Sequence, residues 1–168
     1  GGAISGSASS TLPFTLSESK QIKARIMYTE SNWSAINEAT FEVGDAVSNL
    51  RITEIMYNVN DPNHEFIELK NIGGSAIPLN LVKLTNGIDF TFPRLSLPAG
   101  GYCVAVRNAA SFALRYSGFG GVIAGEFVGA INNGGERIEL QDALGETILN
   151  FRFKDGWYPI TDGDDFSL

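Results

Sequence analysis

Two glutamates interrupt segments that are otherwise apolar and alternate as strands do. Glu54 lies in ITEIMYN at 52–58, and Glu68 lies in EFIELKN at 65–71. If these segments form neighbouring strands, the two carboxylates are close enough to share a cation or a proton. The pair is therefore the candidate metal site of this sequence.

A structural role is the alternative for the pair, and it is the stronger prediction. Calcium takes roughly six to eight oxygen ligands, which is more than two strand glutamates offer. A buried carboxylate without a partner costs several kcal/mol, so each glutamate needs hydrogen bonds or a basic neighbour. We expect backbone amides and a basic side chain, such as Arg51 or Lys70, to supply them.

Three aromatic residues are candidate ligand-binding residues, because exposed rings can stack on sugars. Trp33 stands beside a turn, and Trp157 and Tyr158 lie in DGWYP at 155–159. The competing interpretation is that these rings cover the ends of a β-sandwich core. A second acidic cluster lies nearby, but its Asp-Gly pairs are typical of turns, and it lacks the spacing and terminal glutamate of an EF-hand loop. Its members are Asp155, Asp162, Asp164 and Asp165.

The residues needed for nucleophilic catalysis are not arranged in a recognisable motif. The sole histidine, His64, lies in the polar turn NDPNHEF, and the sole cysteine, Cys103, lies in the apolar segment GYCVAV. A nucleophile needs a base and an orienting group, and no G-x-S-x-G elbow occurs. We therefore predict no catalytic residues, no enzyme activity and no cofactor. Cys103 is predicted to be a small core residue, and a single cysteine forms no intrachain disulfide.

The composition is that of a globular, acidic protein. The 168 residues are 43% hydrophobic and carry a net charge of −7, and the isoelectric point is near 4.6. Phosphate binding needs clustered lysines and arginines, whereas the basic residues here are scattered. No stretch is long and apolar enough to span a bilayer. We expect neither nucleic-acid binding nor membrane insertion.

Short alternating segments separated by turns predict an all-β fold. Asn86-Gly87 indicates a two-residue hairpin, because both turn positions need a positive φ. One helix is predicted at 108–117, with Asn108 as its N-cap and Gly118 at its end. The pattern is typical of an immunoglobulin-like β-sandwich with roughly seven to nine strands and one short helix. The expected strands are 50–57, 65–71, 80–85, 88–92, 101–107, 122–128, 136–141 and 147–153.

The chain divides into three parts by composition. Residues 1–11 are rich in glycine and serine and are interpreted as a linker or a cloning remnant. Residues 12–45 form a small N-terminal β segment, which includes the alternating strand at 21–28 and cannot enclose a core by itself. GDAVSN at 44–49 is the expected junction, and the sandwich is expected to occupy 50–168.

Five motifs of the second part occur in the order typical of a known family. These are I-x-E-I-x-Y-N, E-F-I-E-L-x-N, PAGGYCVAV, the F-x-x-R-Y helix and NNGGERIELQDALGE at 132–146. Together they resemble a bacterial lamin tail domain, which has an immunoglobulin-like fold and usually serves as an accessory module. The resemblance extends over nearly all of residues 50–168, and it aligns Glu54 and Glu68 with glutamates of the family pattern. Animal relatives sit on filament-forming coiled coils, but this chain shows no sustained heptad.

The stretch KARIMYTESNWSAINEATFEV at 23–43 carries a second resemblance. It is similar to the last strands of the fibronectin-like chitobiase or β-hexosaminidase C-terminal module. That module follows carbohydrate-active domains in secreted bacterial proteins, and Trp33 lies at its hairpin tip. Residues 12–45 are therefore interpreted as the terminal strands of such a module.

The two resemblances imply a non-catalytic accessory module for adhesion, binding or spacing in a larger secreted or cell-surface bacterial protein. The alternative is a carbohydrate-binding accessory domain attached to a hydrolase, in which Trp33, Trp157 and Tyr158 stack on sugar. The expected partners are other domains of the same polypeptide and protein or polysaccharide surfaces. An enzyme that uses Glu54 and Glu68 directly is the least favoured of the three.

Overall fold

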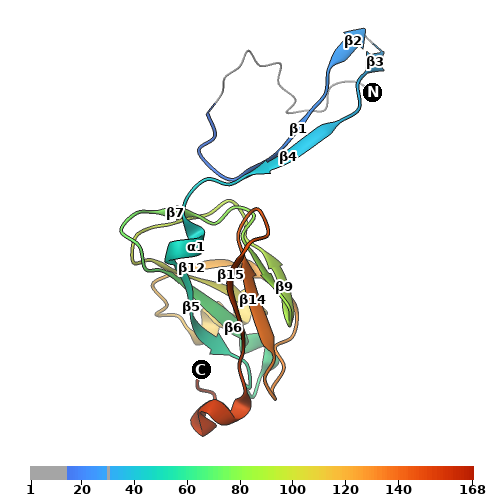
Figure 1. The fold of residues 1–168 in the computed structure, drawn as a ribbon. Helices are drawn as coiled ribbons and strands as arrows, with labels where there is room; N and C mark the ends of the chain where they lie inside the picture. The colour runs from blue at the N-terminus through green and yellow to red at the C-terminus, as the bar shows by residue number, and fades with distance from the viewer. Residues whose placement is uncertain (1–14, 30) are drawn as a thin grey trace.

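The computed structural model describes residues 15–168, except residue 30, and its main body is built on two packed β-sheets (Figure 1). One sheet has four strands and the other has five, which agrees with the expected sandwich. The four-stranded sheet runs in the order β12 (Val122–Glu126), β11 (Tyr102–Val106), β6 (Phe66–Asn71) and β5 (Leu50–Met56). The five-stranded sheet runs β13 (Val128–Gly129), β9 (Ile88–Thr91), β8 (Lys83–Thr85), β14 (Arg137–Gln141) and β15 (Thr147–Arg152). A small separate pair joins β7 (Ile77–Pro78) to β10 (Ser96–Leu97).

The main core lies between the two sheets, and the alternation of β6 shows how it is built. Ile67 and Leu69 are fully buried in this core, whereas Phe66 belongs to a second cluster on the outer face of the sheet. Each large aliphatic side chain removed from water contributes about 1.5–3 kcal/mol. Cys103 is buried in the main core, and burial raises the pKa of its thiol to about 12, as suits a packing residue rather than a reactive thiol.

Helix α2 (Ala109–Arg115) covers part of the outer face of the four-stranded sheet and connects the parallel pair β11 and β12. The predicted cap is confirmed: the Asn108 side chain accepts a hydrogen bond from the Ser111 amide at 2.9 Å. Phe112, on the buried side of the helix, packs edge-on against Phe66, with 5.3 Å between the ring centroids. These contacts form the second, smaller core, which also contains Met56, Val59, Val104 and Val106.

The predicted hairpin turn is also present. Asn86 and Gly87 both have positive φ, at 61° and 80°, and they connect β8 to β9. Two expected strands differ in extent: the segment 80–85 becomes extended only at Lys83, and 122–128 divides into β12 and β13.

The expected junction at 44–49 contains a helical turn, α1 (Ala46–Asn49). Asp45 caps it by accepting a hydrogen bond from the Ser48 amide at 3.1 Å, and Ala46 is buried in the main core. Gly44 has a φ of +107° and lies against Pro78, so closely that a Cβ would meet the proline ring at 2.8 Å. This segment therefore packs against the sandwich and is not an exposed linker.

Residues 20–41 form a two-stranded arm that projects from one end of the sandwich (Figure 1). Strands β1 (Lys20–Ala24) and β4 (Asn37–Phe41) pair along its lower part, and β2 (Met27–Thr29) pairs with β3 (Asn32–Trp33) at its tip. The single strand expected at 21–28 is thus interrupted after Ala24. Several apolar side chains of the arm are exposed, namely Ile26, Met27, Tyr28, Ile36 and Phe41.

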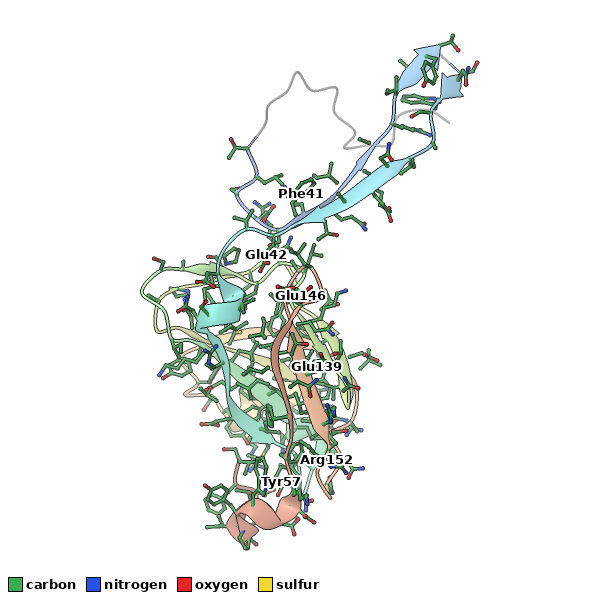
Figure 2. All side chains as sticks on the ribbon, viewed as in Figure 1. Phe41, Glu42, Tyr57, Glu139, Glu146 and Arg152 are labelled. Atoms are coloured by element: carbon green, nitrogen blue, oxygen red, sulfur yellow. The ribbon has the colours of Figure 1, made fainter. Side chains whose placement is uncertain are left out.

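Polar contacts hold the base of the arm on the sandwich. Glu18 pairs with Arg94, and the Asn80 amide donates to the Ser19 carbonyl. Phe41 and Glu42 mark this base in Figure 2. Burial, and then the nearby Asp142, raises the pKa of Glu42. The linker expected at 1–11 lies outside the described residues.

The last residues return to the sandwich at the end opposite the arm (Figure 1). Two short 3₁₀ turns, η2 (Asp155–Trp157) and η3 (Pro159–Thr161), follow β15. Leu168 then exchanges two backbone hydrogen bonds with Ile55 on β5, at 2.9 and 3.0 Å. Another 3₁₀ turn, η1 (Pro62–His64), precedes β6. Of the helices in the part of the chain described here, none is long and apolar enough to cross a membrane.

Deletion of residues 1–41 should leave the sandwich folded. The described arm contributes no residue to either core cluster, and the deletion removes only the polar contacts of Glu18 and Ser19 from the sandwich. The melting temperature should therefore fall by only about 2–4 °C, which corresponds to about 1 kcal/mol. Thermal unfolding of the two proteins, followed by near-ultraviolet circular dichroism, checks this. Loss of the cooperative transition would mean that the sandwich depends on the arm.

Candidate functional site

The two glutamates are brought together by a β-bulge in β5. Ile52 pairs with Leu69 and Glu54 pairs with Glu68, so Thr53 is the extra residue between the two pairs. A bulge places two residues opposite one and changes the face on which the following side chains lie. Ile52 accordingly packs against the main core, whereas Glu54 lines a cavity on the other face of the sheet.

Hydroxyl groups hold both carboxylates. The Thr53 hydroxyl donates to Glu68 Oε1 at 2.7 Å, and the Ser167 hydroxyl donates to Glu54 Oε2 at 3.2 Å. The expectation of backbone amides and a basic side chain is therefore wrong. The alternation of side chains along a strand does not reveal a bulge or a distant contact. It therefore could not show that Thr53 and Ser167 would supply hydroxyl groups instead.

The two basic side chains considered for the pair are engaged elsewhere. Arg51 donates to the carbonyls of Val47, Ser48 and Leu50 at the end of α1. The Lys70 ammonium lies over the Tyr102 ring, 4.6 Å from its centroid. Among the ion pairs of the described residues, none includes Glu54 or Glu68.

Glu68 is 9% exposed, and it titrates differently from a surface glutamate. Burial raises the pKa of its carboxyl group, and the neighbouring Glu54 raises it further, while Thr53 and Lys70 act in the opposite direction. The proton is therefore held more tightly in the folded protein than in the unfolded chain. Two facing carboxylates with this environment can share a proton or attract a cation.

A cavity of about 320 Å³ opens beside the pair, on the outer face of the four-stranded sheet. Aromatic rings from β6, from α2 and from the residues after it line the rest of the cavity. Tyr116 differs from the other rings, because its hydroxyl is buried and has no hydrogen-bond partner among the residues that the structure describes. The complete lining is Glu54, Phe66, Glu68, Phe112, Tyr116, Gly118 and Phe119.

The geometry offers a metal ion few ligands. In the described part of the chain, no group of three or more histidine, cysteine, aspartate or glutamate side chains is placed to hold a metal. The remaining walls of the cavity are aromatic, and aromatic carbon does not replace the oxygen ligands that calcium or magnesium requires. The pair alone is thus a poor calcium site.

The three aromatic candidates do not form one surface. Trp33 is in β3 at the tip of the arm, and Trp157 and Tyr158 are at the opposite end of the molecule (Figure 1). Trp33 is partly buried and lies under the Arg25 guanidinium, whose carbon is 4.2 Å from the ring centroid. A sugar could contact either end, but no single ligand of ordinary size could contact both.

Trp157 and Tyr158 are 49% and 62% exposed, so the interpretation that they close the end of the core is wrong. Tyr57 and Phe153 do this, with ring centroids 5.0 Å apart, and the Tyr57 hydroxyl lies 3.1 Å from the Thr161 hydroxyl. Figure 2 shows Tyr57 at this end of the molecule.

The second acidic cluster ties the C-terminal segment to the sandwich. Asp162 accepts a hydrogen bond from the Asn58 amide, and Asp165 accepts two from Asn60. Arg115 lies 3.5 Å from Asp165 and also contacts the His64 ring at 3.2 Å. These carboxylates and the sole histidine therefore have identified structural partners.

Two buried polar residues of the EFIELKN motif were missed by sequence reasoning. Glu65 is 3% exposed, accepts from Arg107 at 2.8 Å and accepts from the Ile131 amide at 3.0 Å. Asn71 is fully buried and bridges the end of β6 to the loop before β11. Their only signal was a polar residue at each end of an apolar strand, which ordinarily marks a turn.

Glu68→Gln should remove a pH-dependent destabilisation. Because the pKa of Glu68 is raised, its contribution to stability is present below the ordinary glutamate pKa and is lost as pH rises through the folded-state value. Glutamine keeps the acceptor for Thr53 and stays neutral. The unfolding free energy of the wild type, relative to the variant, should therefore fall as pH rises from the ordinary glutamate pKa, about 4.3, through the higher folded-state pKa.

Urea unfolding of both proteins across this pH range measures that difference. Other buried carboxyl groups, such as Glu65, affect the pH dependence of stability equally in the wild type and the variant. Their contributions therefore cancel in the difference. A wild type that gains stability over the variant as pH rises would contradict the burial of an unpaired carboxylate at this position.

The comparison with known families agrees with the fold. Residues 44–155 match the family model of the lamin tail domain, and the matched region includes α1 and both main sheets. No curated protein matches this chain. The match covers more than half of the chain and contains the bulged strand, the EFIELKN strand and helix α2. On this evidence the chain belongs to the lamin tail domain family.

Proposed function

We propose that this chain is a non-catalytic accessory module for adhesion, binding or spacing in a larger secreted or cell-surface bacterial protein. The lamin tail domain is a non-enzymatic, immunoglobulin-like domain, which supports the non-catalytic role. The observation that carries the proposal is the cavity itself. Its two carboxylates are accompanied mainly by aromatic rings, and no serine, threonine, cysteine or histidine is among the lining residues.

The arm supports a position next to other domains of the same polypeptide. It exposes large apolar side chains on a two-stranded ribbon, and an isolated ribbon of this kind is marginally stable in water. Contact with a neighbouring domain would cover these side chains. This agrees with the interpretation of residues 12–45 as the last strands of a fibronectin-like module.

A carbohydrate-binding role is the second candidate, and the exposure of Trp157 and Tyr158 favours it. Exposed aromatic rings are the usual surface on which a sugar ring stacks. Binding to nucleic acid or to an anionic membrane is not proposed, because a net charge of −7 opposes both.

Two assays of the purified chain test these proposals. Incubation with glycosidase and phosphoesterase substrates should give no turnover above buffer. Turnover that disappears in Glu54→Gln and Glu68→Gln would overturn the non-catalytic role. Affinity electrophoresis through gels that contain xylan, chitin derivatives or β-glucan tests the second candidate. Retardation that is lost in Trp157→Ala, but not in Trp33→Ala, would establish carbohydrate binding at the C-terminal end.

A further inference from the structure

The cavity beside Glu54 and Glu68 presents hydrogen-bond acceptors with unused capacity. Glu68 uses one oxygen to accept from Thr53, and its second oxygen has no hydrogen bond among the described residues. Glu54 likewise uses only Oε2, which accepts from Ser167. The Tyr116 hydroxyl is buried and has no hydrogen-bond partner in the described part of the chain. A buried polar atom that lacks its hydrogen bond costs roughly 1–3 kcal/mol, so the Tyr116 hydroxyl needs an explanation. The second oxygens of Glu54 and Glu68 keep some contact with solvent, and they add acceptors at the same cavity.

The charge of the cavity selects a cation. Both carboxylates line it, and two basic side chains of this region have other partners. Lys70 lies over the Tyr102 ring, and Arg115 contacts Asp165, His64 and the ring of Tyr116. The negative charge of the pair is therefore not neutralised by an ion pair within the described structure. An anion would be repelled, and a neutral ligand would leave the charge uncompensated.

The aromatic wall restricts the kind of cation further. Phe112 packs edge-on against both Phe66 and Phe119, and Phe66 packs in the same way against Tyr116. Such rings supply none of the oxygen ligands that calcium or magnesium requires. They suit an organic cation, since alkyl carbon packs against rings and an ammonium group is attracted to their faces.

The number of acceptors matches one chemical group. A primary ammonium carries three N–H donors and accepts none. The two carboxylates and the Tyr116 hydroxyl supply acceptors from three different elements: β5, β6 and the end of α2. A quaternary ammonium would leave all three acceptors unpaired, and a guanidinium presents its five donors in a plane, which is a different arrangement.

We propose that the Glu54–Glu68 cavity binds a primary alkylammonium group, the chemistry of a lysine side chain or of a small aliphatic amine. This inference rests on the proposed binding role and names its ligand class. The alkyl chain packs against the ring wall formed by Phe66, Phe112 and Phe119. The ammonium group occupies the carboxylate side, where it supplies the donors that Glu68, Glu54 and Tyr116 lack.

The test uses n-butylammonium chloride as the probe and the whole chain as the receptor. Amide chemical shifts in ¹H–¹⁵N NMR spectra, recorded at pH 7 and constant ionic strength, should move saturably for residues that line the cavity. Butan-1-ol, which keeps the alkyl chain but lacks the charge, should bind at least about tenfold more weakly, because hydrogen bonds to charged groups are the stronger ones. Tetramethylammonium, which has the charge but no N–H donor, should also bind more weakly.

Variants locate the site and separate binding from folding. Glu68→Gln and Glu54→Gln should each weaken butylammonium binding about tenfold, and Tyr116→Phe should weaken it a few-fold. Glu146→Gln is the matched control. Glu146 is exposed in the turn between β14 and β15 on the five-stranded sheet (Figure 2), so its neutralisation should leave binding unchanged. Thermal melting of each variant confirms that it is folded before it is titrated.

A comparison of two ligands distinguishes the sources of the ammonium group. Nα-acetyl-lysine methylamide should bind as well as butylammonium if the cavity accepts a lysine side chain from a polypeptide, and more weakly if only small amines fit. Either result supports the proposal. Equal binding of butylammonium and butan-1-ol, tighter binding of tetramethylammonium, or no saturable shift at the cavity would overturn it. None of these results would bear on whether the module is catalytic, which the turnover assay tests separately.

Discussion

Glu65→Ala should lower the free energy of unfolding by about 3 kcal/mol, because it removes the one carboxylate that accepts from both donors of a buried network. The Glu65 carboxylate joins the Arg107 guanidinium after β11 to the Ile131 amide before β14. The Glu65 carbonyl also accepts from the Arg107 amide at 2.9 Å. Alanine would leave the Ile131 N–H buried without an acceptor and would leave Arg107 without its counter-ion.

Urea unfolding at pH 7 measures the effect. Glu146→Ala, which truncates an exposed glutamate, is the control and should change stability by less than about 0.5 kcal/mol. The double variant Glu65→Ala/Arg107→Ala should lose less than the sum of the single variants, because the two side chains share one interaction. A loss below about 1 kcal/mol in Glu65→Ala would show that the network does not hold β6, β11 and β14 together.

Asn71→Ala should be about as destabilising, at roughly 3 kcal/mol, since one buried amide holds several backbone groups. The Asn71 Nδ2 group donates to the carbonyls of Ser75, Leu97 and Pro98 at 2.7–3.0 Å. Its Oδ1 atom accepts from the Gly73 amide at 2.9 Å. The side chain thus fixes the loop after β6 against the segment between β10 and β11.

Asn71→Asp sharpens this prediction, because aspartate has the same shape and lacks the donors. It would place a carboxylate against three carbonyl oxygens and should destabilise more than alanine does at pH 7. Asn150→Ala is the control: Asn150 is exposed and accepts one hydrogen bond, from Arg137. Equal melting temperatures for the wild type and Asn71→Asp would contradict the buried bridge.

The strands and the helix could be predicted from the sequence because their signals are local. Alternation placed β5, β6, β11, β14 and β15 within a residue or two of their bounds, and Asn108 marked the start of α2. The Asn86-Gly87 turn followed from the need for positive φ. These features depend on neighbouring residues only.

The bulge at Thr53 could not be predicted from the alternation of residues along the strand. It determines which side chains of β5 line the cavity. Strict alternation puts Glu54 on the same face as Ile52 and Met56, whereas the structure puts Ile52 against the main core and Met56 in the outer cluster. The predicted hydrogen-bond partners of the two carboxylates were also wrong, because one of the actual partners is distant in the sequence. Ser167 lies 113 residues from Glu54 in the chain, and no local pattern indicates such a contact.

The roles of Glu65 and Asn71 were likewise invisible, because their partners are distant. Glu65 contacts a residue 66 positions away, and Asn71 contacts residues 26 and 27 positions away. Trp157 illustrates the opposite error. An aromatic residue near the end of a sandwich was expected to be buried, but Tyr57 and Phe153 already fill that position.

The central claim is that Glu68 is a buried carboxylate that lies beside Glu54 and has no basic partner. Titration of Glu68 by NMR tests this claim most directly. The side-chain carboxyl ¹³C shift of Glu68 would be followed from acid to mildly alkaline pH in the free protein. The expected pKa lies above the ordinary glutamate value of about 4.3, and Glu54→Gln should lower it by removing the neighbouring charge. A pKa at or below the ordinary value would mean that Glu68 is solvated or paired with a cationic side chain of the protein. That result would contradict the claim that the carboxylates of this cavity have no cationic partner within the protein.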